Sequence, residues 1–167
     1  MFMKGKIKVL SKKLFDTMMH FRGINDDTVE TFADHAFISF RCSDNAIKQF
    51  DGKRADITAH HWFQSPHPNV LNIAFDDIGP QLKKENLTFT LFDETHAVQI
   101  LDFWKKNRGK TWYIHCTAGK SRSGACGDFI RQIEGYDLET FQRDNPIVDP
   151  NGHILRILSE VYAESYS

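Results

Sequence analysis

The sequence predicts an α/β fold in which a central, mainly parallel sheet of four or five strands is flanked by helices. Four short runs rich in β-branched and aromatic residues, at positions 6–10, 36–41, 69–75 and 111–115, have the length and composition of buried strands. Segments in which apolar residues recur at helical spacing lie between and after these runs. Strands that alternate with helices are typical of parallel sheets. We find no internal repeat or domain boundary, so residues 1–167 are expected to form one domain.

The first half of the chain contains two predicted helices and one stretch without a clear pattern. A helix follows Ser11, and its apolar face is expected to carry Leu14, Phe15 and Met18. The spacing Asp27-x-x-Glu30 predicts a capping box at the start of a short helix that ends near Phe32. The polar, histidine-rich stretch 44–68 predicts no regular element.

The helices of the second half are predicted more clearly, because each has caps as well as an apolar face. The first carries the apolar positions Ala97, Ile100, Leu101 and Trp104. Asp93 or Thr95 is expected to cap its start, and Gly109 its end. A second helix is predicted over residues 123–135. The last helix follows Asn151, its expected N-cap, with an apolar face of Ile154, Ile157, Leu158 and Val161.

The composition is that of an ordinary globular protein, with 41% hydrophobic and 26% charged residues. The formal net charge of −1 argues against a protein that wraps duplex nucleic acid or lies on an anionic membrane, because both need a basic excess. No apolar stretch approaches the roughly 18 residues of a membrane span. The opening MFMKGKIKVL interleaves lysines with apolar residues, unlike a secretory signal. Three cysteines cannot all pair with one another, which fits a reducing compartment, so we expect a cytoplasmic protein without membrane insertion.

The chemistry is concentrated in the segment HCTAGKSRSG, residues 115–124, which joins a predicted strand to a predicted helix. Backbone N–H groups at such a junction converge on an anion. Cys116 lies in the positive field of the helix start and of Lys120 and Arg122, which favours the thiolate at neutral pH. The Arg122 guanidinium offers a fork of donors to two oxygens of a tetrahedral oxyanion. Gly119 permits the close backbone approach that a cradle for an anion needs.

The pattern Cys-x5-Arg-Ser, preceded by His and placed between a strand and a helix, resembles the phosphate-binding loop of cysteine-dependent protein tyrosine phosphatases. HCTAGKSRS is most similar to the dual-specificity branch of that family. The resemblance implies that Cys116 attacks phosphorus and that Arg122 and the loop amides bind the phosphate oxygens. It also implies that Ser123 assists departure of the sulfur and that His115 fixes the loop. The implied phosphate-binding residues are Thr117, Ala118, Gly119, Lys120, Ser121 and Arg122.

The same resemblance implies a general acid from a loop upstream of the nucleophile. LNIAFDDIGP offers Asp76 and Asp77 at the end of a predicted strand, and the FDDG forms of related phosphatases favour Asp77. Asp76 is the alternative. The segment PQLKKENLTFTLF accounts for the long spacing between this acid and Cys116. Asp93 lies nearer in the sequence, but its place before a helix predicts a cap instead.

The resemblance therefore implies a hydrolase that needs no metal or other cofactor and removes phosphate from phosphotyrosine, and from phosphoserine or phosphothreonine, on proteins or peptides. Lys120 leaves a phosphoinositide or an RNA 5′-phosphate open as the substrate, because it adds positive charge to the loop. A non-catalytic module that binds phosphoproteins is an alternative of a different class. Intact Cys116, Arg122 and Asp77 argue against that module, since a degenerate binder usually loses one of them. The oligomeric state is left open.

Two cysteines and three histidines remain. Cys126 lies on the apolar face of its helix and is predicted to be part of the core. Cys42 follows strand 36–41, and relatives with a cysteine there make it a candidate redox partner of Cys116, with simple burial as the alternative. A metal site at His60, His61 and His67 lacks a paired Cys or acidic ligand at a recognised spacing, so a solvated loop is the better prediction.

Overall fold

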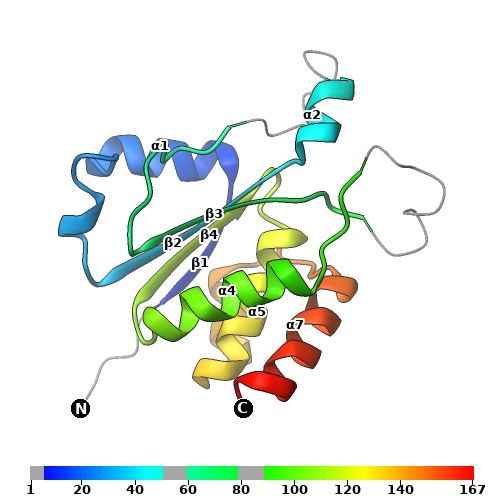
Figure 1. The fold of residues 1–167 in the computed structure, drawn as a ribbon. Coiled ribbons are helices and arrows are strands. Elements are labelled where there is room, and N and C mark those ends of the chain that lie inside the picture. Colours follow the sequence, from blue (N-terminus) through cyan, green and yellow to red (C-terminus); the bar gives the residue numbers. More distant parts are fainter. Residues whose placement is uncertain (1–5, 51–59, 79–88) are drawn as a thin grey trace, which may run out of the picture.

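The computed structural model describes residues 6–50, 60–78 and 89–167, and it is built on a four-stranded, entirely parallel sheet (Figure 1). The strands are β1 (Ile7–Ser11), β2 (His35–Arg41), β3 (Val70–Ala74) and β4 (Thr111–Cys116). Their order in the sheet is β1-β4-β2-β3, and each neighbouring pair is parallel. The predicted fold class is therefore confirmed, with four strands. Each of the four predicted strands forms within one or two residues of its expected bounds.

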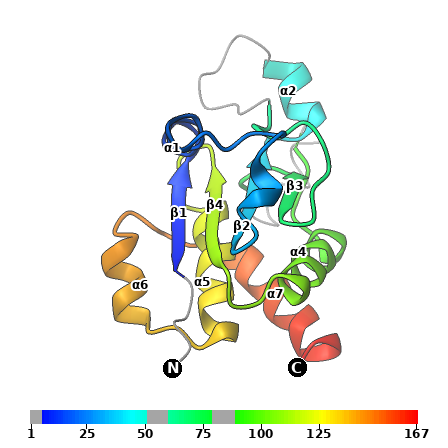
Figure 2. The ribbon, with the colours of Figure 1, turned by 90° about the vertical axis from the view of Figure 1, so that its left-hand side faces the viewer.

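One face of the sheet is covered by helices from the second half of the chain. These are α4 (Glu94–Lys106), α5 (Arg122–Glu134), α6 (Leu138–Asp144) and α7 (Gly152–Ser165) (Figures 1 and 2). Their buried apolar side chains form one core with the sheet. Asp93 caps α4 in a capping box with His96, so Asp93 rather than Thr95 is the cap. The predicted end at Gly109 is wrong, because Asn107 already occupies the C-cap. Gly135 ends α5 as predicted.

The opposite face is covered by α1 (Lys12–Arg22) and a 3-10 turn, η1 (Val29–Thr31). Phe15 and Met19 are the buried side chains of α1, one helical turn apart. The predicted apolar face is correct for Phe15 and for Met18, which packs against the same cluster, but it is wrong for Leu14, which is 59% exposed. The Cβ of Leu14 points about 100° away from that of Phe15, so the two neighbours cannot both face the sheet.

The capping box predicted at Asp27 does not form. Thr28 occupies the N-cap of η1 without a side-chain cap, and the Asp27 amide donates instead to the side chain of Asn25. Asn25 and Thr28 hydrogen-bond to one another and close a turn, which takes the place of a helix start. Two short helices were not predicted: α6, which Asp137 caps, and α2 (Asp44–Phe50), which follows β2.

The parallel arrangement brings the carboxyl ends of all four strands to one edge of the sheet. Figure 2 shows β1 and β4 side by side, with the start of α1 at that edge. The segments after β2, β3 and β4 are therefore neighbours in space although they lie far apart in the sequence. In the ranges that the structure describes, no helix is long and apolar enough to cross a bilayer.

Candidate active site

The loop of residues 116–122, called the Cys116 loop below, connects β4 to α5 at the carboxyl edge of the sheet. Gly119 turns the loop with φ of +69°, in the left-handed region that glycine favours. A Cβ at this position would lie 2.4 Å from both the carbonyl carbon of Leu10 and the amide nitrogen of Ser11. No other residue fits there, so Gly119 is needed for the turn itself.

Carbonyl groups of the Cys116 loop are held away from its concave side by backbone amides of two other segments. The amide of Lys12 donates to the Thr117 carbonyl at 3.2 Å. The amides of Asp149 and Asn151 donate to the carbonyls of Lys120 and Ser121 at 3.0 and 3.2 Å. With these acceptors turned outward, the loop amides are left on the inner side, where a helix N-terminus adds its positive field. The loop is thus built to receive an anion.

Cys116 stands at the end of β4 on the side of the sheet that α5 covers. Burial by itself raises the pKa of the Cys116 thiol, but Arg122, the Ser123 hydroxyl and the amides of Ser123 and Lys120 together hold that pKa below its ordinary value. The Cys116 Sγ and Ser123 Oγ atoms are 3.0 Å apart. Ser123 is fully buried behind the sulfur, so its hydroxyl is positioned to donate to a thiolate.

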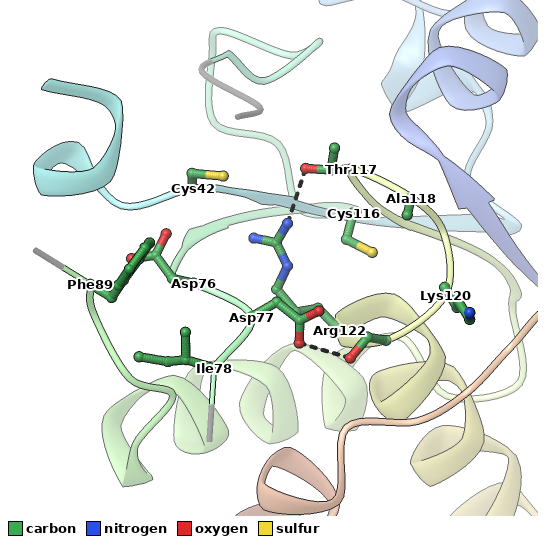
Figure 3. Close-up of a pocket in the computed structure, with 11 residues that line it drawn as sticks. Cys42, Asp76, Asp77, Ile78, Phe89, Cys116, Thr117, Ala118, Lys120 and Arg122 are labelled. Atoms are coloured by element: carbon green, nitrogen blue, oxygen red, sulfur yellow. Dashed lines mark hydrogen bonds between the residues drawn. The ribbon is translucent and has the colours of Figure 1, made fainter. Parts of the chain in front are cut away.

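Arg122 brings a buried positive charge into the same loop. Its Nη1 donates to the Phe75 carbonyl at 2.8 Å and its Nη2 donates to Thr117 Oγ1 at 3.0 Å (Figure 3). Arg122 is only 4% exposed, and within the described ranges no carboxylate forms a salt bridge with it. Its Nε is buried and has no hydrogen-bond partner there. A buried guanidinium with an unused donor is costly unless an anion approaches it.

The two adjacent aspartates after β3 have different environments. Asp76 is buried and accepts hydrogen bonds from the Ser43 amide at 3.0 Å, the Ser43 hydroxyl at 2.5 Å and the Thr90 amide at 2.7 Å. Both of its oxygens are therefore occupied in joining three segments of the chain. Asp77 is exposed, and its Oδ1 accepts a 2.7 Å hydrogen bond from Ser121 Oγ (Figure 3). Of the two, Asp77 therefore has the more accessible carboxyl group.

His115 lies on the opposite face of β4 from Cys116, where its ring packs against Phe15. Burial, together with nearby cations such as Lys12, lowers the pKa of His115 to about 3, so the ring is neutral. Its Nδ1 donates to the Cys116 carbonyl at 3.4 Å, so its Nε2 accepts from Ser39 Oγ at 2.6 Å. Ser39 Oγ in turn accepts from His61 Nδ1 at 2.8 Å. A directed chain of hydrogen bonds therefore runs from His61 to the backbone of Cys116.

This chain includes two residues that the sequence analysis did not single out as site residues. Ser39 had one available signal, because it is a polar residue that stands within the apolar run AFISFR of a predicted buried strand. His61 had no such signal, since its neighbours in the sequence show no regular pattern. Its pKa is lowered to about 4 by burial and by the charges of Arg41 and Lys12, so this ring is also neutral.

A cavity of about 320 Å³ opens over the Cys116 loop. It is lined by Cys116, Thr117, Ala118, Lys120, Ser121 and Arg122 from the loop, and by Cys42, Asp76, Asp77, Ile78 and Phe89 from the neighbouring segments (Figure 3). The predicted site residues therefore come together around this cavity. Three of them, Gly119, His115 and Ser123, do not line it themselves. Gly119 lies against the end of β1, Ser123 contacts the Cys116 sulfur, and His115 binds the Cys116 carbonyl from the opposite face of the sheet.

The remaining predicted residues are placed as follows. Cys42 is buried, is reduced and lines the same cavity as Cys116. Cys126 is fully buried in the core, and burial raises the pKa of its thiol, as expected of an inert cysteine.

In residues 6–50, 60–78 and 89–167, no group of three or more His, Cys, Asp or Glu is arranged to hold a metal. His61 binds Ser39 and His67 binds Asp26 at 2.9 Å. The proposed origin of the long spacing, in residues 80–92, lies largely outside the described residues.

Comparison with known proteins gives a distant structural similarity. No family model and no curated protein matches the sequence. The fold is similar to that of PTPMT1 in its crystal structure in complex with PI(5)P, with a TM-score of 0.47 and 11% sequence identity. The aligned region covers 95% of this chain and 91% of that one. So divergent an overlap assigns neither a family nor a function, and the chemistry rests on the geometry of the site.

Proposed function

We propose that this protein is a phosphatase that hydrolyses phosphate monoesters through a cysteinyl-phosphate intermediate, and that it belongs with the dual-specificity protein tyrosine phosphatases. The observation that carries the proposal is the buried Arg122, whose unpartnered Nε lies in the same loop as a cysteine of lowered pKa. A thiolate and a guanidinium fork side by side are suited to a tetrahedral oxyanion. Loop amides turned toward the same space add donors for the remaining oxygens.

In the first step, the Cys116 thiolate attacks phosphorus and the bond from phosphorus to the leaving oxygen breaks. Asp77, exposed at the rim of the cavity, gives its proton to that oxygen. Arg122 and the loop amides hold the three equatorial oxygens as charge develops on them. In the second step a water molecule attacks phosphorus, loses a proton to Asp77 and displaces the sulfur. Ser123 donates to the departing thiolate across the 3.0 Å contact.

The proposed substrates are phosphotyrosine and, beside it, phosphoserine or phosphothreonine on proteins or peptides. Two apolar side chains, Ile78 and Phe89, line the cavity together with Asp77 (Figure 3), which suits an aromatic leaving group. Lys120 also lines the cavity, and its charge suits substrates that carry further negative groups. Phosphoinositides and RNA 5′-phosphates are therefore included in the test as competing substrates.

The mechanism is tested with p-nitrophenyl phosphate in the presence of a chelator. The wild type should release phosphate, Cys116→Ser should be inactive, and Asp77→Asn should be slower by about 10²-fold or more, the usual contribution of a general acid. Cys126→Ala is the matched control, because it removes a cysteine from the core of α5 without touching the cavity. Activity that survives in Cys116→Ser would refute the mechanism.

The substrate class is tested with a panel of phosphopeptides, phosphoinositides and a 5′-phosphorylated RNA. Phosphotyrosine peptides should give the highest kcat/KM and should be retained by Asp77→Ala, which binds substrate but cannot protonate the leaving group. A preference for the lipid or the RNA would reassign the substrate and keep the mechanism. Binding of phosphopeptide with no turnover under any condition would instead identify a binding module.

A further inference from the structure

Two segments that are distant in the sequence donate hydrogen bonds to a single oxygen of Asp77. Ser121 Oγ in the Cys116 loop donates to Asp77 Oδ1 at 2.7 Å. Asn151 Nδ2, just before α7, donates to the same oxygen at 2.9 Å. Within the described residues, no hydrogen bond is made to the other oxygen, Oδ2. The two oxygens of this carboxyl group are therefore not equivalent.

The Asn151 amide is fixed in this orientation by the helix that it caps. Its Oδ1 accepts from the amides of His153 and Ile154 at 3.0 and 3.1 Å. The reverse orientation would place the NH₂ group against two N–H donors, so Nδ2 must face Asp77. The backbone N–H of Asn151 also donates to the Ser121 carbonyl at 3.2 Å. Asn151 is thus attached to α7, to the Cys116 loop and to Asp77 at once.

A protonated carboxyl group has one oxygen that carries the proton and one that only accepts. Because Oδ1 already accepts from two N–H or O–H donors, the acid form of Asp77 must carry its proton on Oδ2. The Ser121 hydroxyl can rotate to another acceptor, whereas the Asn151 donor cannot turn away without losing the cap. Asn151 is therefore the stronger constraint on which oxygen holds the proton.

We propose that Asn151 is a positioning residue for the general acid, which it holds so that the proton lies on Oδ2 and faces the leaving group. The proposal rests on the proposed function, because it assigns a partner to the acid of that reaction. It predicts that the importance of Asn151 depends on how much help the leaving group needs. A tyrosine-like phenol, with a pKa of about 10, needs the proton, whereas a strongly acidic phenol leaves without it.

The test compares kcat/KM of Asn151→Ser and of the wild type on phenyl phosphate and on difluoromethylumbelliferyl phosphate, whose leaving group is much more acidic. Serine retains the N-cap but is too short to reach Asp77. We expect a loss of about tenfold on phenyl phosphate, at the upper end for one neutral hydrogen bond, and less than about twofold on the acidic ester. In an Asp77→Asn background, the same substitution should have no further effect on phenyl phosphate.

A purely structural contribution of Asn151 would give a different pattern. Equal losses on both esters, or a full additional loss in the Asp77→Asn background, would overturn the proposal. Asp137→Ala is the matched control, since it removes a similar cap from α6 and should leave the ratio of the two esters unchanged. If Asn151→Ser unfolds, Asn151→Thr retains a capping oxygen without a donor that reaches Asp77 and should show the same selective loss. A wild type without turnover, or an active Cys116→Ser, would instead show that the proposed function has failed.

Discussion

Lowering the pH from 7 to 5 should destabilise the fold through the two neutral histidines behind the Cys116 loop. In the folded protein the pKa of His115 is about 3 and that of His61 about 4, because burial disfavours the charged rings. In the unfolded chain the same residues take up a proton below about pH 6.5. Between pH 6.5 and about 4 the unfolded state therefore binds more protons, and the free energy of unfolding falls as the pH falls.

The size of this effect follows from the distance between the working pH and the unfolded pKa. At pH 5 each unfolded histidine is about 1.5 pH units below its pKa, which corresponds to about 2 kcal/mol per residue. The pair should therefore lower the free energy of unfolding by about 4 kcal/mol relative to pH 7. Burial lowers the pKa of His96 as well, against the opposing charge of Asp93, and adds in the same direction. A typical domain has only about 5–15 kcal/mol in total.

Urea denaturation at pH 7 and pH 5, followed by tryptophan fluorescence at constant ionic strength, measures this difference. His61→Asn should reduce the pH dependence by about 2 kcal/mol, because asparagine retains a donor for Ser39 but does not titrate. His20→Asn, on the exposed side of α1, is the control and should leave the dependence unchanged. A wild type that loses less than about 1 kcal/mol at pH 5, or a His61→Asn variant with the full dependence, would refute the reasoning.

Three further predictions concern the cavity itself. Gly119→Ala should lower kcat/KM by about 10²-fold or more, because its Cβ would force the backbone of Leu10 away from the loop; near-wild-type kinetics would contradict this. Arg122→Lys should lose a similar factor despite the conserved charge, since lysine lacks the planar fork, and steady-state kinetics will show whether it does. Mild peroxide should convert the Cys116 thiolate to a sulfenic acid, which condenses with the Cys42 thiol to a disulfide and water. Mass spectrometry that finds a sulfonic Cys116 and no link to Cys42 would rule this out.

How far the sequence predicted the site is illustrated by the two aspartates. In the sequence, a predicted strand is followed by two acidic residues. This pattern predicted that Asp76 and Asp77 both lie at the edge of the sheet, beside the Cys116 loop. The choice between them depends on Ser43 and Thr90, which bind Asp76 but lie far from it in the sequence. Such partners leave no local signal. Asp77 was favoured through the resemblance, and the burial of Asp76 supplies the physical reason for that choice.

Periodicity has a similar limit. The sequence of α1 contains apolar residues on more than one face, so spacing alone did not distinguish Leu14 from Met19. Packing on the sheet makes the choice, because Phe15 must lie against Phe37 and Phe63. The Cys116 loop was predicted well for the opposite reason. Cys116, Gly119 and Arg122 lie within seven consecutive residues of one loop, so most of the geometry of the loop is encoded by the local sequence.

The part of the site that local sequence does not encode is the outer support of the loop, and the packing of α5 makes that support possible. Gly124 lies in the first turn of α5, where this helix packs against the segment before α7. A Cβ at this position would lie 2.9 Å from Val148 Cγ1. That segment carries the amides of Asp149 and Asn151, which bind two carbonyls of the Cys116 loop. A larger residue at position 124 would displace the side chain of Val148, which stands next to Asp149 in this segment. The close approach at this glycine therefore places α5 beside the segment whose hydrogen bonds join the Cys116 loop, Asp77 and the start of α7.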